Sequence, residues 1–141
     1  DHHDHNSVCT DSDPSYTAGE TVVGTSGHVS FTLTANEPTP PEKGENTMTL
    51  NLATLDGDPI SDASVVVEPF MIDHGHGTSP ATFSATSNGD GSYTTPAIDL
   101  FMSGVWDITF TADVPSPVHD TAGGDAESTV DSAVFSFCLE G

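Results

Sequence analysis

The feature that most constrains the fold is a set of short segments in which apolar and polar residues alternate. Trp106, Ile108 and Phe110 alternate with polar residues in 105–112, and 28–34 and 48–53 repeat the pattern. Strand side chains point to opposite faces in turn, so the pattern predicts half-buried β-strands. No window of about 11 residues or more carries a helical apolar stripe, which predicts an all-β chain.

Turn residues separate these segments from further expected strands. Asp56-Gly57-Asp58-Pro59 precedes a β-branched run at 65–67, and Asn88-Gly89-Asp90-Gly91 suits a turn with positive φ before Tyr93. We also expect a short strand around Phe83 and a last strand over 134–139. The sequence therefore predicts an antiparallel, two-sheet, immunoglobulin-like β-sandwich of seven to eight strands over 21–141, preceded by an irregular arm over 1–20.

The charge of the chain excludes two classes of partner. The sequence carries 22 acidic residues against one basic residue, Lys43, for a formal net charge of −21. A nucleic-acid-binding protein needs a basic surface to neutralise phosphates, and an anionic membrane surface would repel this chain. No apolar run approaches the roughly 20 residues of a spanning helix. We therefore expect no nucleic-acid partner and no insertion of this domain into a membrane.

The two cysteines, Cys9 and Cys138, stand near opposite ends of the chain. They lack the C-x-x-C spacing of a metal site and any local signature of a catalytic thiol, so a single disulfide is the favoured interpretation. A disulfide indicates an oxidising compartment, which predicts a periplasmic or secreted protein. No signal peptide begins the sequence, so we expect a mature form from which a targeting segment has been removed, with lipid anchoring before processing as a further option.

Five of the seven histidines fall in two clusters, and the clustering suggests a metal site. Imidazole suits copper, zinc and nickel, and copper(II) binds a generic nitrogen site most tightly of the three, so copper is predicted and zinc is the weaker alternative. In an extended segment His74 and His76 would project from the same side. Met71 and the distant Met102 are candidate soft donors, although methionines in such positions are more often core residues. The competing interpretation of this segment is a solvated glycine-rich loop.

The second cluster lies at the start of the sequence and contains His2, His3 and His5. Asp1-His2-His3 could form an amino-terminal copper or nickel site if the native chain starts at Asp1. Histidine-rich termini are also common remnants of tags and linkers. Either of the single histidines, His28 and His119, could join a site in space.

Several short motifs between residues 44 and 112 follow one another in a recognisable order. They are an alternating strand at 46–55, the turn at 56–60, a strand at 63–71 leading into His74-Gly75-His76, then Gly91-Ser92-Tyr93, and Met102-Ser103-Gly104-Val105-Trp106. In this order they resemble the YtkA-like family of small extracytoplasmic β-sandwich domains, which is related in pattern to the FixH proteins of oxidase assembly. The resemblance implies a role in copper handling and no catalytic residues.

These observations lead to two functional hypotheses from different classes. The first is a copper-binding carrier, buffer or delivery domain, with a metal ion and a copper-accepting protein as its partners. The second is an adhesion or scaffold domain that binds protein or glycan and whose histidines are incidental. No nucleophile elbow or zinc-protease motif is present, so a zinc-dependent enzyme ranks last and we expect no enzymatic activity.

Overall fold

The computed structural model describes residues 8–115 and 129–140, and within these residues the protein consists of strands and connecting segments without a helix. No described segment is a helix long and apolar enough to cross a membrane. The all-β prediction is confirmed. The strands are β1 (Glu20–Val23), β2 (Val29–Glu37), β3 (Gly44–Thr54), β4 (Ser64–Met71), β5 (His76–Gly77), β6 (Phe83–Ser87), β7 (Ser92–Thr94), β8 (Ile98–Leu100), β9 (Gly104–Val114) and β10 (Thr129–Leu139).

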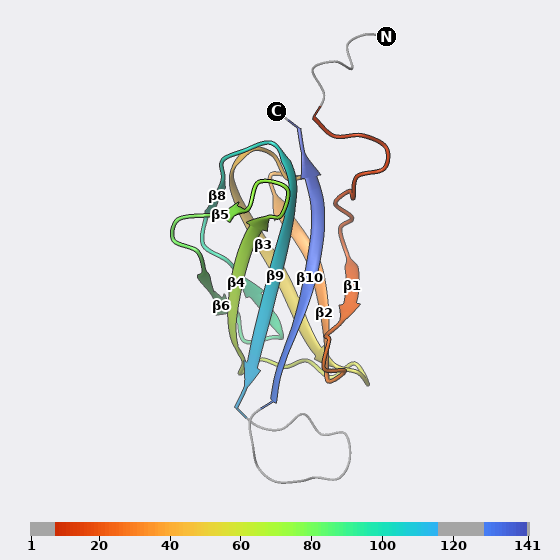
Figure 1. Ribbon diagram of the computed structural model, residues 1–141. Helices are drawn as coiled ribbons and strands as arrows, with labels where there is room; N and C mark the ends of the chain where they lie inside the picture. The colour runs from red at the N-terminus through yellow and green to blue at the C-terminus, as the bar shows by residue number, and fades with distance from the viewer. Residues whose placement is uncertain (1–7, 116–128, 141) are drawn as a thin grey trace.

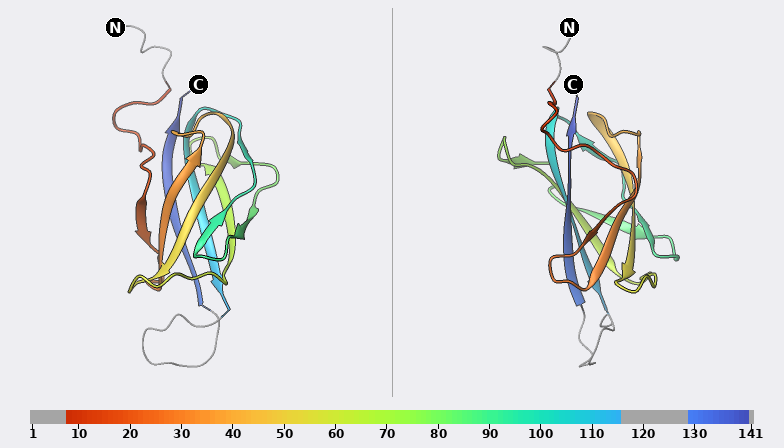
Figure 2. Two further views of the ribbon diagram at one scale, coloured as in Figure 1. Left: turned by 180° about the vertical axis from the view of Figure 1, so that it is seen from behind. Right: turned by 90° about the vertical axis from the view of Figure 1, so that its right-hand side faces the viewer.

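All strand pairs are antiparallel and form one continuous path, β1-β2-β3-β7-β6-β4-β9-β10, with β8 beside β3 and β5 beside β4. β1, β2 and β3 form one layer, and β4, β9 and β10 form the layer facing it (Figures 1 and 2). The short strands β6 and β7 pair with each other and connect the layers, which makes the fold nearly a barrel. The antiparallel prediction is confirmed. The immunoglobulin-like sandwich is not confirmed. The described residues contain ten strands, whereas seven or eight were expected.

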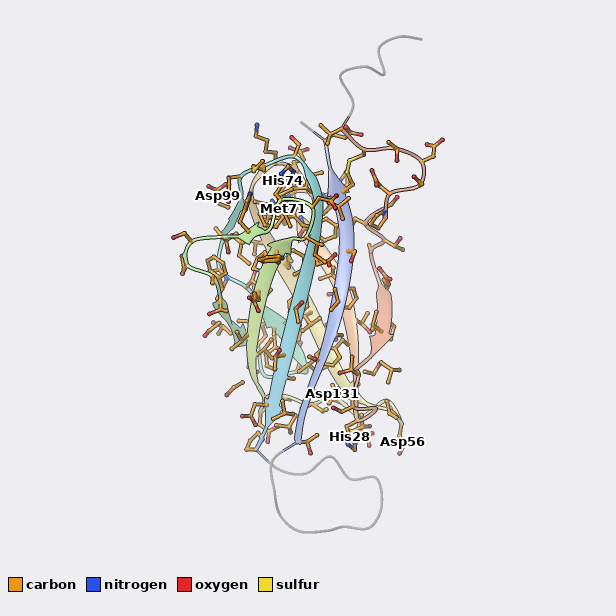
Figure 3. All side chains as sticks on the ribbon, viewed as in Figure 1. His28, Asp56, Met71, His74, Asp99 and Asp131 are labelled. Atoms are coloured by element: carbon orange, nitrogen blue, oxygen red, sulfur yellow. A yellow bond between two sulfur atoms is a disulfide. The ribbon has the colours of Figure 1, made fainter. Side chains whose placement is uncertain are left out.

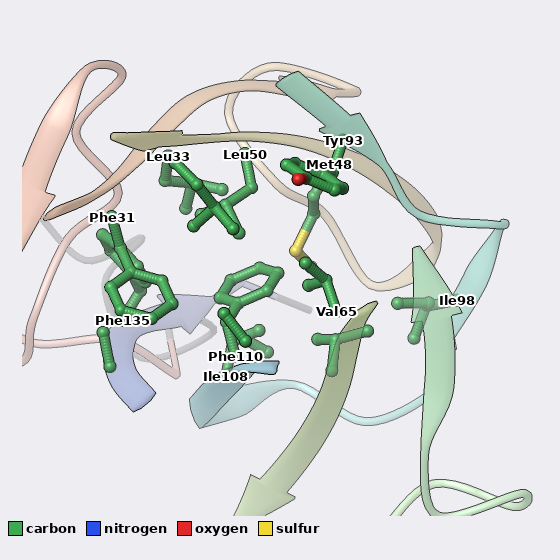
Figure 4. Packing of buried hydrophobic residues seen from close by; sticks show 14 of the residues in the cluster. Phe31, Leu33, Met48, Leu50, Val65, Tyr93, Ile98, Ile108, Phe110 and Phe135 are labelled. Carbon is green, nitrogen blue, oxygen red and sulfur yellow. The ribbon is translucent and has the colours of Figure 1, made fainter. Parts of the chain in front are cut away.

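The predicted inward faces line the space between the two layers. Trp106, Ile108 and Phe110 are fully buried. Phe31 is fully buried as well, and only 1% of the Leu33 surface is exposed. Figure 4 shows how side chains from the two layers interdigitate, with Phe110 and Phe135 of β9 and β10 in edge-to-face contact. The alternation in the sequence therefore identified the core-facing residues correctly.

One strand departs from the simple alternation. A β-bulge between Leu33 and Ala35 shifts the phase of β2, so that Asn36 points inward and the strand continues through Glu37. The buried amide of Asn36 donates to the side chain of Asn46 at 2.9 Å. The alternating pattern predicted a strand over 28–34, whereas β2 continues to Glu37 because the bulge turns Asn36 into an inward polar contact.

The side of the barrel between β10 and the β1–β2 connection is closed by a carboxylate. Asp131 of β10 is 2% exposed and accepts hydrogen bonds from the backbone N–H groups of Ser26, His28 and Val29 at 2.7, 2.9 and 2.9 Å. A side chain at Gly24 would overlap this carboxylate, so the connection approaches β10 this closely only with glycine there. Asp131 therefore joins the two ends of the sheet path.

The predicted disulfide is confirmed. Cys9 and Cys138 are bonded, with their Cα atoms 5.9 Å apart, and no described cysteine is free. The backbone N–H of Cys138 also donates to the carbonyl of Pro14 at 3.0 Å. These contacts hold the described part of the N-terminal arm along the end of β10.

Candidate metal site

The His-Gly-His segment lies at the tip of the β4–β5 hairpin. β4 ends at Met71, and the chain then turns tightly, with the Gly75 N–H donating to the Met71 carbonyl at 2.8 Å. Gly75 has φ +70°, a conformation that favours glycine. Residues 72–75 thus form a turn, so His74 and His76 do not lie in one extended segment.

The hairpin nevertheless brings the two imidazoles together. His74 lies in the turn and is exposed, whereas His76 is half-buried in β5. Their ring centroids are 5.8 Å apart, with 34° between the ring planes. The proximity comes from the reversal of the chain and not from strand alternation.

Strand register places a methionine below His76. Met71 and His76 are directly opposite each other in the antiparallel β4–β5 pair, so their side chains share one face of the hairpin. Met71 is fully buried, which means that this face is the inner one. His76 therefore stands at the edge of the core, next to a buried thioether side chain.

The segment before β9 covers the same end of the barrel. Phe101 stacks on His76, with ring centroids 5.6 Å apart and 18° between planes, and meets Trp106 edge-to-face at 5.9 Å. The indole N–H of Trp106 donates to the carbonyl of Met102 at 2.9 Å. Sequence reasoning missed Phe101; the available signal was a phenylalanine at a turn, between the core-facing residues Leu100 and Met102.

Gly104 lets this segment approach the hairpin. It has φ +126°, and a Cβ atom at this position would lie 2.9 Å from the Cε methyl of Met71. The thioether side chain of Met71 therefore lies against the segment that carries Met102, which is itself half-buried against the core. The structure brings Met71, His74 and His76 to one end of the barrel, with Met102 in the adjacent segment.

These side chains can be tested against the requirements of a metal ion. Among residues 8–115 and 129–140, no three His, Cys, Asp or Glu side chains gather in one place. A site here would thus combine two imidazoles with thioethers. A first-row metal ion lies about 2 Å from a ligating nitrogen, and the centre of the imidazole ring lies roughly 1 Å beyond that nitrogen. Two imidazole rings bound to one ion therefore have centres about 5 to 6 Å apart. The separation of the two rings fits that requirement.

The other predicted ligands are not part of this group. His2, His3, His5 and His119 lie outside the described residues. His28 lies at the opposite end of the barrel from His74 and Met71, beside Asp131 (Figure 3). It does not join the hairpin site.

Comparison with known proteins gives one solved structure and one family. A copper-bound variant of FetP from uropathogenic Escherichia coli is similar to this chain at 17% sequence identity and a TM-score of 0.39, covering 89% of this chain and 90% of that one. No curated protein matches the chain. The YtkA-like family model matches residues 25–111, a span that contains the whole β4–β5 hairpin, Phe101, Met102 and Trp106. This protein belongs to the YtkA-like family.

Proposed function

We propose that this protein binds copper at the β4–β5 hairpin and serves as an extracytoplasmic carrier, buffer or delivery module. The observation that carries the proposal is the pair of imidazoles of His74 and His76, whose ring centroids are 5.8 Å apart, next to the buried thioether of Met71. His74 and His76 are the nitrogen ligands, and Met71 and Met102 are the candidate sulfur ligands. The role is binding, without a catalytic step.

The mixed donor set supports copper over zinc. Imidazole nitrogen suits copper(II), and thioether sulfur selects copper(I). A site that offers both donor types can hold either oxidation state, whereas zinc gains little from a thioether. The thioether also needs no deprotonation, so only the imidazoles compete with protons for this site.

The disulfide supports the compartment. Structural disulfides persist in oxidising surroundings such as the periplasm and the extracellular space. The Cys9–Cys138 bond is consistent with a periplasmic or secreted protein. In that setting His2 and His3 would add ligands from the arm, and a copper-accepting protein would be the partner for delivery.

Competition titration of metal-free protein with copper tests the proposal. His74→Ala and His76→Ala should each weaken copper binding more than tenfold, because each removes one inner-sphere donor from a small site. His28→Ala is the matched control, since His28 lies at the other end of the barrel, and it should bind as the parent does. Affinity should also fall at acid pH, because protons compete with the metal for imidazole nitrogen.

Removal of residues 1–7 separates the hairpin from the arm. A site made by the hairpin keeps most of its affinity after this truncation, whereas an amino-terminal site loses it. If His74→Ala and His76→Ala both bind copper as tightly as the parent, the hairpin is only a turn and the proposal fails.

A further inference from the structure

Phe101 is a large apolar side chain that the core does not account for. It is 42% exposed, although both of its neighbours in sequence pack against or within the core. Its ring is instead nearly parallel to the imidazole of His76 and offset from it, with ring centroids 5.6 Å apart and 18° between planes. Phe101 therefore contacts two aromatic rings, those of His76 and Trp106.

The stacking geometry suits a metal ligand. The lone pairs of imidazole nitrogen lie in the plane of the ring, so a phenyl ring on the face leaves them free to bind. His76 Nδ1 lies 3.4 Å from the carbonyl oxygen of Gly77. When Nδ1 carries the hydrogen and donates to that oxygen, Nε2 remains as the ligating atom. The ring is thus limited in rotation while one nitrogen stays available.

A continuous set of contacts connects Phe101 to the core. Trp106 is fully buried, and its indole meets the edge of the Phe101 ring at a centroid distance of 5.9 Å. The same indole anchors the next residue, through the hydrogen bond to the carbonyl of Met102. Phe101 is therefore fixed by the rigid part of the molecule, and it passes that constraint to His76.

The two histidines differ in this respect. His76 is paired in β5 and stacked on Phe101, whereas His74 is exposed in the turn. We propose that Phe101 is a positioning residue of the copper site, which holds His76 as the fixed ligand while His74 completes the coordination from the turn. This inference rests on the proposed function. It adds that His76 is the preorganised ligand and that Phe101 holds it in place.

The chain supplies a matched control at Phe70. Like Phe101, this residue is a partly exposed phenylalanine, with 37% of its surface exposed. It belongs to the hairpin that carries His76 and lies opposite Gly77 in the β4–β5 register. It adjoins Met71 in β4, so its side chain points to the opposite face from Met71 and His76. A general effect of losing a phenyl ring at this end of the barrel should therefore appear equally in Phe70→Leu and Phe101→Leu.

The experiment has two readouts on the full chain. The first is the NMR shift of the His76 ring protons without metal, which the ring current of the adjacent phenyl displaces in the parent. Phe101→Leu should abolish that displacement, and Phe101→Tyr and Phe70→Leu should retain it. The second is copper affinity by competition titration. Phe101→Leu should weaken it about tenfold, the lower end of the range for groups that orient a ligand, with Phe101→Tyr and Phe70→Leu near the parent.

The outcomes separate this inference from the proposed function. If the parent binds copper and Phe101→Leu binds it equally well, Phe101 positions nothing and only this inference is overturned. The same holds if Phe70→Leu weakens binding as much as Phe101→Leu, because the effect is then one of hairpin stability. If the parent binds no copper, the proposed function fails, and this inference fails with it.

Discussion

Asp131 closes the barrel between β10 and the β1–β2 connection. Burial of its carboxyl raises the pKa, but hydrogen bonds from the backbone N–H groups of Ser26, His28, Val29 and Ser132 outweigh burial and hold the pKa below its usual value. A carboxyl whose pKa is lower in the folded state stabilises the fold above its unfolded pKa. That contribution is lost as the pH falls through the folded pKa.

Replacing this carboxylate should therefore cost stability in a pH-dependent way. We expect Asp131→Asn to lower the free energy of unfolding by about 2 kcal/mol at pH 7, because a neutral amide is a weaker acceptor and turns its own N–H groups toward the same donors. The difference from the parent should be constant above about pH 5 and shrink below about pH 4. Denaturant titrations across this pH range measure it.

Asp113→Asn is the control for that measurement. Asp113 is exposed on the neighbouring strand β9, so its replacement removes the same formal charge without touching the closure. Its effect should stay within about 0.5 kcal/mol. An equal loss in both variants would mean that net charge, and not the four hydrogen bonds, governs the result.

At the scale of secondary structure, the β4–β5 hairpin presents the candidate site, and it does so with a strand of two residues. A Cβ atom at Gly77 would lie 2.6 Å from the backbone oxygen of Pro69 and 3.3 Å from Phe70. Glycine therefore permits β5 to lie this close to β4. The position of His76 depends on that close approach.

Gly77→Ala should displace β5 while leaving both imidazoles in the sequence. We expect copper affinity to fall about tenfold, as for other changes that misplace a ligand, with little loss of global stability because β5 is so short. Gly89→Ala is the control, since Gly89 has φ +90° and no neighbour within 4 Å. That variant should lose about 1 kcal/mol of stability and no copper affinity. Unchanged affinity in Gly77→Ala would show that the ligands do not depend on hairpin register.

At the scale of the whole molecule, the disulfide connects residues separated by 129 positions. Closing so long a loop removes conformational freedom from the unfolded chain. In the chain-entropy model the stabilisation is about 5 kcal/mol. The hydrogen bonds from Cys138 to Pro14 and from Val8 to Glu140, both 3.0 Å, lie at the same end and would remain without it.

The double variant Cys9→Ser, Cys138→Ser should therefore be less stable by about 5 kcal/mol in denaturant, with the same folded strands by circular dichroism. Reducing the parent should produce the same loss, which controls for the substitutions themselves. A difference below about 1 kcal/mol, or two free thiols by mass spectrometry of unreduced protein, would contradict the assignment of a structural disulfide.

Much of the fold could be predicted because alternation is local information. Trp106, Ile108 and Phe110 are recognisable as one face from their spacing alone, and the Asn88-Gly89-Asp90-Gly91 turn has its glycines at φ +90° and +94°. The sequence could not predict the bulge that turns Asn36 inward, since a bulge inserts one residue into the period and both phases match the local pattern. It also could not predict that β6 and β7 connect the layers, because strand pairing is decided between distant segments.

The candidate site divides in the same way. The sequence by itself determined the donor types, the two cysteines available for a disulfide, and the clustering of His74 and His76, because these follow from residue types and their positions along the chain. Only the tertiary structure decided that Met71 lies beneath His76 and that Phe101 stacks on it. Those relations arise from the β4–β5 register and from the segment before β9, which meet only after the core has closed, and no local pattern specifies which distant side chain a given imidazole will contact.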